Sequence, residues 1–178
     1  KYYDDPRDWD LSELRKADVV VGNFIAHELA WGAHVDAPFK AKVIEISAGL
    51  DIDPNDLMAV MAFESARTFS PSIRNPVSNA VGLIQFMPKT AISLGTSSDQ
   101  LANMPAIQQL DYVEKYLRSF NKKLKDIYDL YACVLWPKAI GKDKSYVLFS
   151  NKFNKSAYKN NKGLDANDDG VVTKAEAA

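Results

Sequence analysis

Residues 53–65 read Asp-Pro-Asn-Asp-Leu-Met-Ala-Val-Met-Ala-Phe-Glu-Ser, and this stretch decides the fold. Asp53 can cap a helix in which Pro54 takes the first position. The seven residues from Leu57 to Phe63 are all apolar, so we expect this helix in the middle of the protein, with every face buried. The helix is predicted to end at Glu64.

The segments on either side of this helix also have helical patterns. Asp10 and Glu13 resemble a capping box, which predicts an opening helix that continues toward Trp31. Turn-forming residues dominate after Ser65 until Pro88, so we expect an irregular loop or a small β-hairpin there. Strand patterns are weak, and the predicted fold class is a mainly α, single globular helical domain. The other predicted helices span residues 39–50, 88–94, 105–120 and 126–136.

Length and composition exclude several classes of protein. The chain has 178 residues, 47% hydrophobic and 25% charged, which is typical of a globular domain and not of a disordered or fibrous chain. The longest apolar run has seven residues, far short of the roughly 20 that cross a bilayer, so no membrane span is expected. A single cysteine, Cys133, excludes an internal disulfide, and its apolar neighbours predict a buried packing thiol. The chain starts with Lys1, and we expect it to be a processed or excised piece.

Charge is distributed unevenly along the chain. The net charge is only −1, but the segment from Lys115 to Lys162 holds 12 bases and three acids, with aromatic residues between them. Such a segment suits a polyanion such as nucleic acid or a phosphate-bearing cell envelope, or it is a solvated lysine-rich surface. No nucleic-acid-binding motif accompanies it, so nucleic acid is not an expected partner.

The acid at the end of the central helix is the main candidate for chemistry. Glu64 follows seven apolar residues and lies at the negative end of the helix dipole. Burial and the dipole both favour the protonated carboxyl, which is the form that a general acid needs. Alternatively, Glu64 pairs with Arg67 three residues later, the carboxylate stays ionised, and no catalysis follows. Spacing alone leaves both interpretations open.

The order of motifs after Glu64 resembles one enzyme family. Glu64-Ser65 is followed by Phe69-Ser70-Pro71 and by Ser78-Asn79-Ala80-Val81-Gly82-Leu83-Ile84-Gln85-Phe86-Met87-Pro88. Over residues 38–140 this resembles the lytic transglycosylases of the soluble (SLT) type, relatives of goose-type lysozyme, with Ile84 in place of the family's methionine. The sequence looks most similar to phage tail lysozymes and phage muralytic domains, where Leu-Ile-Gln-Phe and a later Leu-Trp-Pro also occur. The resemblance implies a lysozyme-like fold, α+β in the broad sense.

The resemblance also implies a role for individual residues. Glu64 would be the sole catalytic acid and base, protonating the glycosidic oxygen between N-acetylmuramic acid and N-acetylglucosamine in peptidoglycan. Ser65 and Gln85 would hold Glu64 and the sugar N-acetyl group; without the resemblance, Ser65 bonds its own backbone and Gln85 is a solvent-facing amide. Gly82 permits a turn or a close backbone approach to sugar. Phe69, Phe86 and Met87 either wall the groove or fill the core, and Ser78 completes the predicted substrate-binding set.

A third family motif, Ala-Tyr-Asn-Ala-Gly, is not reproduced here. Its tyrosine faces the catalytic glutamate in the family, whereas the corresponding region reads Leu130-Tyr131-Ala132-Cys133-Val134-Leu135-Trp136-Pro137. Tyr131 is the nearest candidate for this role. Tyr128, three residues earlier on the same helix face, is the second candidate. Either tyrosine could instead pack in the core.

The fate of the cleaved bond depends on a second carboxylate. Inverting glycosidases need a base that activates water, and retaining ones need a nucleophile or assistance from the substrate. The chain has no Asp or Glu between Ser65 and Ser98, so only a distant acid could serve. The simpler prediction is that the N-acetyl oxygen assists departure and the C6 hydroxyl closes a 1,6-anhydro ring, with Glu64 acting as acid and then as base. The distant acids are Asp111, Asp126 and Asp129.

Residues 165–176 match the EF-hand calcium pattern. The flanks are weaker, because Asn160, Asn161 and Gly163 make a poor entering helix and the chain stops two residues after Glu176. We predict a structural calcium ion here; the alternative is a capped turn without metal. The predicted ligands are Asp165, Asn167, Asp169, the backbone carbonyl of Val171, Thr173 and Glu176, with Gly170 at the glycine position.

Together these features predict a peptidoglycan lytic transglycosylase of phage origin that needs no cofactor for catalysis. The alternatives are a goose-type muramidase that hydrolyses the same bond with water and a non-enzymatic cell-wall-binding tail module. The enzyme would act on the bacterial cell wall, in the periplasm or at the cell surface, as a virion component or after release from an infected cell. Its partners would be peptidoglycan glycan strands and other virion or tail proteins. The predicted domains are an N-terminal helical extension at 1–37, the catalytic domain at 38–140 and a basic C-terminal segment at 141–178.

Overall fold

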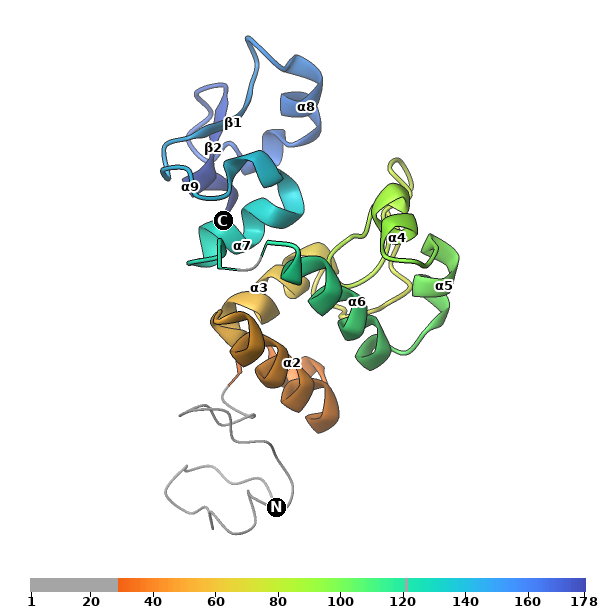
Figure 1. Cartoon of the computed structure of the whole chain (residues 1–178). Helices are drawn as coiled ribbons and strands as arrows, with labels where there is room; N and C mark the ends of the chain where they lie inside the picture. The colour runs from red at the N-terminus through yellow and green to blue at the C-terminus, as the bar shows by residue number, and fades with distance from the viewer. Residues whose placement is uncertain (1–28, 121) are drawn as a thin grey trace. The chain divides into compact units, whose positions relative to one another are not determined.

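The computed structural model describes residues 29–120 and 122–178, which are mainly helical (Figure 1). This described part contains eight α-helices and one two-stranded sheet, which confirms the predicted mainly α class. The predicted helix that begins near Asp10 lies outside the described residues. The chain divides into two compact units, Lys1–Tyr112 and Val113–Ala178, and the boundary falls inside α6 (Ala106–Arg118). Within the described ranges, no helix is both long and apolar enough to span a bilayer.

The first unit is built on two helices that pack against each other, α2 (Ala37–Leu50) and α3 (Pro54–Glu64). Both begin at a capping aspartate: Asp36 Oδ1 accepts a hydrogen bond from Phe39 N at 3.0 Å, and Asp53 Oδ1 accepts one from Asn55 N at 2.8 Å. Each cap satisfies a backbone donor that the first helical turn leaves unpaired. The predicted start of α3 at Asp53 and Pro54 is therefore confirmed, whereas α2 begins at Ala37, two residues before the predicted range 39–50.

α3 supplies the centre of this unit's core. Leu57, Met58 and Met61 are 0% exposed, and each side chain of this kind contributes about 1.5–3 kcal/mol when buried. The expected burial of every face is not complete, because Ala59 is half-buried and Phe63, in the last turn, is 60% exposed. The middle of α3 therefore lies in the core, whereas its cap Asp53 is exposed and its last residue Glu64 is half-buried.

An irregular loop follows α3, as predicted. It contains two isolated antiparallel bridges, from Arg74 to Val81 and from Val81 to Phe86. The loop is attached to the core by buried apolar side chains, because Leu83 is 0% and Ile84 is 3% exposed. It is thus a packed part of the unit.

Short helices complete the first unit. The predicted helix after Pro88 is α4 (Pro88–Ser93), and it packs against α5 (Ser98–Asn103), which the sequence analysis missed. α5 is short and largely polar, so it has no apolar repeat, and its one local signal is Ser97, whose Oγ accepts a hydrogen bond from Gln100 N at 3.1 Å.

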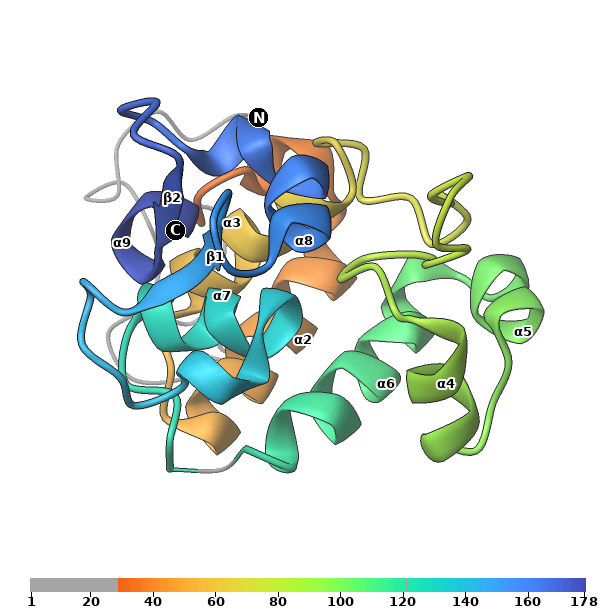
Figure 2. The same cartoon turned by 90° about the horizontal axis from the view of Figure 1, so that it is seen from above.

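The second unit combines α7 (Ile127–Leu135) with the C-terminal segment. β1 (Val147–Ser150) pairs antiparallel with β2 (Val171–Thr173). α8 (Lys155–Asn160) packs on β1, and α9 (Lys174–Ala177) packs on α7 (Figure 2). The C-terminal segment is therefore part of the compact unit that contains α7.

A buried ion pair joins α7 to this segment. Lys174 Nζ donates to Asp129 Oδ1 at 2.5 Å and to the backbone carbonyl of Lys142 at 2.9 Å. The two side chains are 4% and 5% exposed. Burial alone would raise the pKa of Asp129, but the hydrogen bonds from Lys174 and Gly141 N and the Lys174 charge hold it below its usual value.

Cys133 lies on the buried face of α7. Its thiol is 0% exposed and donates to the carbonyl of Leu130 at 3.0 Å. Burial raises the pKa of the Cys133 thiol, which keeps it in the unreactive protonated form. This confirms the predicted packing role.

Candidate active site

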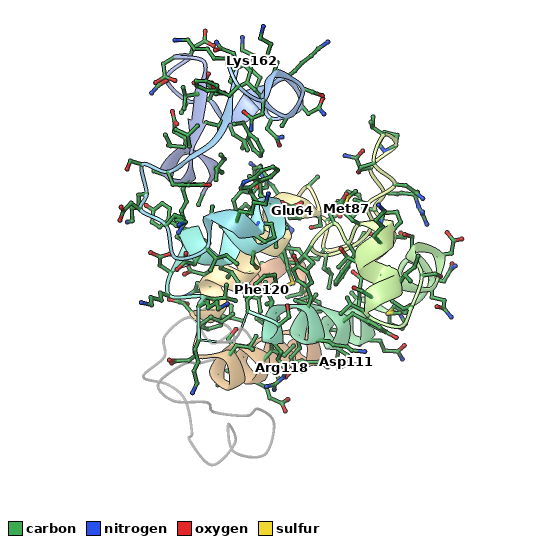
Figure 3. The ribbon with its side chains drawn as sticks, turned by 45° about the horizontal axis from the view of Figure 1, so that its top comes forward. Glu64, Met87, Asp111, Arg118, Phe120 and Lys162 are labelled. Carbon is green, nitrogen blue, oxygen red and sulfur yellow. The ribbon has the colours of Figure 1, made fainter. Side chains whose placement is uncertain are left out.

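The candidate acid, Glu64, is the last residue of α3 (Figure 3). Met61 and Ala62 before it are buried, whereas Glu64 itself is half-buried. Apolar packing therefore supports the end of the helix, while solvent and ligands can reach part of the carboxyl side chain. The sequence analysis expected a partly desolvated carboxyl with a raised pKa at this helix end, and its role as a general acid stays a prediction.

Ser65 organises the turn that follows. It is 0% exposed, its backbone N–H donates to Met61 O at 2.9 Å, and its Oγ accepts a hydrogen bond from Phe69 N at 3.0 Å. Its carbonyl accepts the Thr68 hydroxyl at 2.6 Å. Ser65 thus bonds the backbone of its own turn, and in doing so it fixes where α3 ends.

The turn itself has an unusual backbone. Ala66, Arg67 and Phe69 have φ values of 50°, 66° and 50°, in the left-handed region that residues with a Cβ rarely adopt. Such residues persist only where the surroundings hold them in place. Here the Ser65 hydrogen bonds and the buried Phe69 ring do so, which makes the turn a rigid support for the end of α3.

Arg67 contacts Trp31, whereas the alternative interpretation of Glu64 expected Arg67 to pair with Glu64. Its guanidinium lies over the Trp31 ring, 5.5 Å from the ring centre. Trp31 in turn contacts His34, with ring centres 5.6 Å apart. The cation–π contact orients Arg67 toward Trp31, so it does not support the interpretation of Glu64 as the partner of Arg67.

Gly82 and Gln85 shape the loop that the family resemblance assigns to sugar binding. Gly82 has φ 83°, and a Cβ there would overlap the buried side-chain amide of Gln109. Gln85 Nε2 donates to Ile73 O at 3.3 Å and to Gly82 O at 3.2 Å. The side chain of Gln85 is therefore oriented by its own loop and is not a freely solvated amide.

The remaining residues of the predicted binding set differ in exposure. The rings of Phe69 and Phe86 are 4% and 2% exposed, which favours the core-filling interpretation for both. Met87, two residues after Gln85, is 48% exposed and therefore accessible. Ser78 is half-buried, and its Oγ accepts a hydrogen bond from Ala80 N at 3.3 Å.

Gln109 is a positioning residue that the sequence analysis missed. Its side chain is 0% exposed, and Oε1 accepts a hydrogen bond from Leu83 N at 2.7 Å. Its Nε2 donates to Leu101 O at 2.8 Å and to Pro71 O at 3.1 Å. One amide thereby joins three segments of the first unit, and the loop containing Gly82 depends on it.

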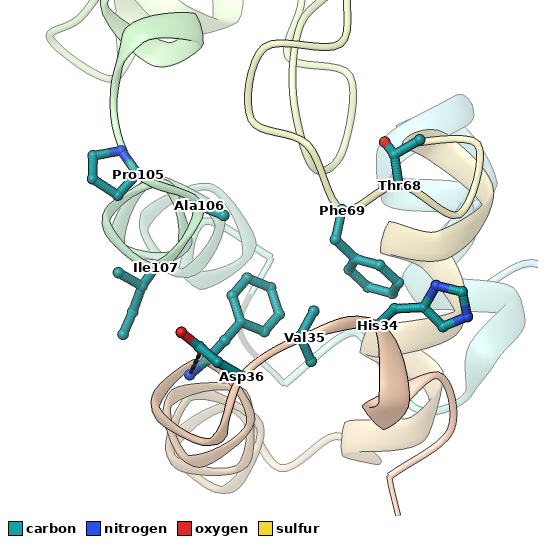
Figure 4. Close-up of a pocket in the computed structure, with 9 residues that line it drawn as sticks. His34, Val35, Asp36, Thr68, Phe69, Pro105, Ala106 and Ile107 are labelled. Carbon is teal, nitrogen blue, oxygen red and sulfur yellow. Dashed lines mark hydrogen bonds between the residues drawn. The ribbon is translucent and has the colours of Figure 1, made fainter.

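A cavity of about 270 Å³ opens in the first unit beside the same turn (Figure 4). Buried Phe39 and Phe69 form part of its wall, and Thr68 comes from the turn that follows α3. Of the predicted substrate-binding residues, Phe69 lines this cavity, and none of its described lining residues comes from the 73–87 loop. The other lining residues are His34, Val35, Asp36, Pro105, Ala106 and Ile107.

Both candidate tyrosines lie on α7, in the second unit. Tyr131 is 5% exposed, whereas Tyr128 is half-buried beneath Lys144, whose Nζ lies 3.9 Å from the ring centre. Glu64 belongs to the first unit, so the approach of either tyrosine to it stays a prediction. Burial makes Tyr131 the more restrained of the two.

The three distant carboxylates all have structural partners. Asp111 Oδ1 lies 2.5 Å from Lys42 Nζ, and Asp126 Oδ1 accepts a hydrogen bond from Asp129 N at 2.9 Å as the cap of α7. Asp129 is the buried partner of Lys174. Each of these acids thus has a partner within its own unit.

The calcium-like loop has the turns of its pattern but not a gathered set of ligands. Asp165 accepts hydrogen bonds from Gly170 N at 3.0 Å and from the Tyr158 hydroxyl at 2.6 Å. Glu176 Oε2 accepts Thr173 N at 2.9 Å and so caps α9. The described residues contain no group of three or more His, Cys, Asp or Glu positioned to hold a metal ion.

The mainly helical fold, with its small two-stranded sheet, is consistent with a lysozyme-like domain. The chain belongs to the Transglycosylase SLT domain family, whose match covers residues 42–141. Membership supports a lytic transglycosylase-type glycosidase that acts on peptidoglycan in the cell wall. Searches of curated proteins and of solved structures found no match.

Proposed function

We propose that this protein is a lytic transglycosylase that cleaves the MurNAc-(β1,4)-GlcNAc bond with Glu64 as its single catalytic carboxylate. The position of Glu64 carries the proposal. It is the half-buried last residue of the buried helix α3, and a rigid turn beginning at Ser65 follows it. Precise placement of one acid matters most where that acid performs both proton transfers.

The proposed reaction has two proton transfers. The Glu64 carboxyl first protonates the glycosidic oxygen as the bond from that oxygen to C1 of MurNAc breaks, and the N-acetyl oxygen of MurNAc assists departure. The resulting Glu64 carboxylate then accepts the proton of the C6 hydroxyl while O6 attacks C1 and closes the 1,6-anhydro ring. The proton returns to Glu64, so no water is consumed and the enzyme is ready for the next cycle.

The partners of the three distant carboxylates support closure of the 1,6-anhydro ring over hydrolysis by water. A hydrolase that inverts needs a second carboxylate to activate water. The segment between Ser65 and Ser98 has no acid. Asp111 pairs with Lys42, Asp126 with an α7 backbone N–H, and Asp129 with Lys174. The sugar's own hydroxyl is then the nearest nucleophile that needs no further base.

Gln85 is proposed to bind the substrate. Its Nε2 is engaged with two loop carbonyls, which orients the amide and leaves Oε1 to accept the N–H of an N-acetyl group. Tyr131 or Tyr128 is proposed to face Glu64, and Ser65 to position it through the turn. These assignments follow the family resemblance of the motifs that carry them.

We assign the enzyme to a phage, as a virion component or a released muralytic protein. The support is the sequence alone: Leu83-Ile84-Gln85-Phe86 and Leu135-Trp136-Pro137 resemble phage tail lysozymes. Detection of the protein in purified virions by mass spectrometry supports the tail assignment. Its absence there together with release at lysis contradicts that assignment and favours a free muralytic enzyme.

Product analysis tests the catalytic proposal. Purified peptidoglycan is incubated with the wild type, with Glu64→Gln and with Glu45→Gln, a matched change at an exposed acid on α2. We expect the wild type and Glu45→Gln to release muropeptides lighter by one water and without a reducing end, and Glu64→Gln to release none. Reducing muramic ends would establish the muramidase alternative, and equal release by Glu64→Gln would contradict the assignment of the acid. Binding without release by any variant would indicate the wall-binding tail module.

We also propose that residues 165–176 bind a structural calcium ion. The donors are hard oxygens, which calcium prefers. Glu176 Oε1 is buried without a hydrogen-bond partner among the described residues, and a ligand would satisfy it. Binding would require the Glu176 carboxylate to turn from Thr173 toward the oxygens of Asp165 and Asp169.

Calorimetric titration with calcium chloride tests this second proposal. We expect binding with a Kd no weaker than about 1 mM and a rise in Tm for the wild type. Glu176→Gln should lose both, whereas Asp168→Asn, a change at the exposed fourth position of the loop, should keep them. No heat of binding and no Tm change at saturating calcium would establish the metal-free capped turn.

A further inference from the structure

The second unit carries a group of lysines that the proposed chemistry does not use. From Lys144 to Leu164 the chain has five lysines and no Asp or Glu. Two of them have partners: Lys162 Nζ lies 3.4 Å from Asp168, and Lys144 lies over the Tyr128 ring. The other three are exposed, and none forms an ion pair with a described residue. We call these three, together with one aromatic residue between them, the basic tip: Lys152, Phe153, Lys155 and Lys159.

A fixed turn presents the basic tip. Asn154 Oδ1 accepts a hydrogen bond from Ser150 N at 2.7 Å, and Asn154 Nδ2 donates to Leu148 O at 3.1 Å. The buried Ser150 hydroxyl accepts Lys152 N at 3.1 Å. These bonds tie the turn to β1, so its side chains are presented without a large loss of backbone entropy on binding.

The side chains of the tip form a charged surface with one apolar group. Lys155 and Lys159 are four residues apart on α8, which places them on one helix face with a rise of about 6 Å between them. Phe153 is 91% exposed. Among the large apolar side chains of the described residues, only Val77 is more exposed, at 93%. Like charges one turn apart repel each other, and a bound anion would relieve that repulsion.

We infer that the basic tip is an accessory binding surface for the acidic peptide stems of peptidoglycan, an inference that rests on the proposed function. Stem peptides carry free carboxylates at every repeat of the glycan, so three ammonium groups, one on the fixed turn and two on α8, meet a repeating set of opposite charges. Phe153 covers the aliphatic part of a stem. A bilayer is a poorer fit, because α8 spans only six residues and supplies no apolar face for insertion beyond Phe153.

This surface retains the enzyme on the insoluble wall between cleavages. Each exposed ion pair is weak, but several pairs that act together slow complete release. Attraction of this kind falls with ionic strength. Cleavage of a short glycan without peptides does not depend on it.

The test compares sedimentation of the full chain with purified sacculi at low and high salt. The variant Lys152→Glu/Lys155→Glu/Lys159→Glu is matched by Lys122→Glu/Lys123→Glu/Lys142→Glu, which makes the same change in net charge at exposed lysines elsewhere in the second unit. We expect the first variant to lose about tenfold in affinity for sacculi at low salt. The matched variant and the melting temperatures should stay close to the wild type.

Two further substrates identify the partner. On sacculi stripped of stem peptides, the tip variant and the wild type should bind equally, and both should cleave short peptide-free glycans at the same rate. Unchanged binding of the tip variant to intact sacculi, an equal loss in the matched variant, or a loss that persists without stem peptides would each overturn the inference. Binding that depends on the tip only with anionic phospholipid vesicles would replace it with a membrane contact. If the wild type releases fragments and the tip variant binds sacculi as tightly as the wild type does, this inference alone is refuted. If the wild type neither binds sacculi nor releases fragments, the proposed function is refuted as well.

Discussion

Replacing Lys174 by methionine should destabilise the second unit through the charge that it leaves behind. Lys174→Met keeps the aliphatic bulk of the side chain but removes the ammonium that lies 2.5 Å from Asp129 Oδ1. The Asp129 carboxylate, 5% exposed, then keeps only Gly141 N at 2.8 Å and Lys125 N at 3.4 Å as donors. The carbonyl of Lys142 also loses its donor.

The expected loss in free energy of unfolding is about 3–5 kcal/mol, the range for a buried ion pair with one partner removed. For a domain of this size that lowers Tm by roughly 6–20 °C.

The pH dependence of the loss separates the effect of the charge from that of side-chain packing. In the wild type the pKa of Asp129 is held below its usual value, so the pair contributes stability above the unfolded pKa of about 3.9 and loses it as the pH falls through the lower folded pKa. In the variant, burial raises that pKa above the unfolded value, so the ionised carboxylate opposes folding above about pH 4. The difference between the two proteins should therefore shrink as the pH falls from about 6 toward about 3.

Urea unfolding followed by circular dichroism over that pH range measures this difference. Lys159→Met, which removes an exposed lysine of α8 without an ion pair, should change the free energy by less than about 0.5 kcal/mol. Adding Asp129→Asn to Lys174→Met should recover much of the loss, because no buried charge remains. A loss below about 1 kcal/mol, or one that is the same at every pH, would refute the reasoning.

Three further substitutions test other contacts by urea unfolding. Gln109→Leu should lower the free energy of unfolding by about 3 kcal/mol, because it leaves buried backbone groups without partners; a change near zero would show that water replaces the amide. Gly82→Ala should cost more than Gly95→Ala, because both have positive φ (83° and 81°) but only at Gly82 does the new Cβ meet the Gln109 amide; equal costs would contradict that close packing. Tyr158→Phe should lower the unfolding midpoint by removing the hydroxyl that donates to Asp165 at 2.6 Å, and an unchanged midpoint would show that solvent supplies the bond.

The elements that sequence could predict are those fixed by nearby residues. Asp53, Pro54 and the apolar run after them lie within one helix, and they set both the start of α3 and its burial. α7 has the same local information, an N-cap at Asp126 and a proline beyond its end. Glu64 is a candidate because such a helix ends there, and the structure places it as the last residue of α3.

The features that sequence missed depend on partners far away in the chain. β1 and β2 are four and three residues long, and each forms only because the other pairs with it. Asp129 and Lys174 are 45 residues apart, and neither neighbourhood indicates an ion pair. Gln109 adjoins Leu110 at the edge of the apolar face of α6, which was the one available signal that its amide is buried.

The acid and the loop proposed to position its substrate are also held by contacts that differ in their separation along the chain. The turn after Glu64 is fixed by a contact over four residues, from Ser65 to Phe69, whereas Leu83 is fixed by Gln109 from 26 residues away. Loss of the Gln109 amide should therefore disturb the loop that contains Gln85 while the end of α3 keeps its position. In the proposed mechanism Glu64 transfers the proton and the loop positions the sugar, so a defect in the loop should appear first as weaker binding of substrate. The proposal therefore predicts that chemistry and substrate positioning are separable, because interactions of different range fix the two segments.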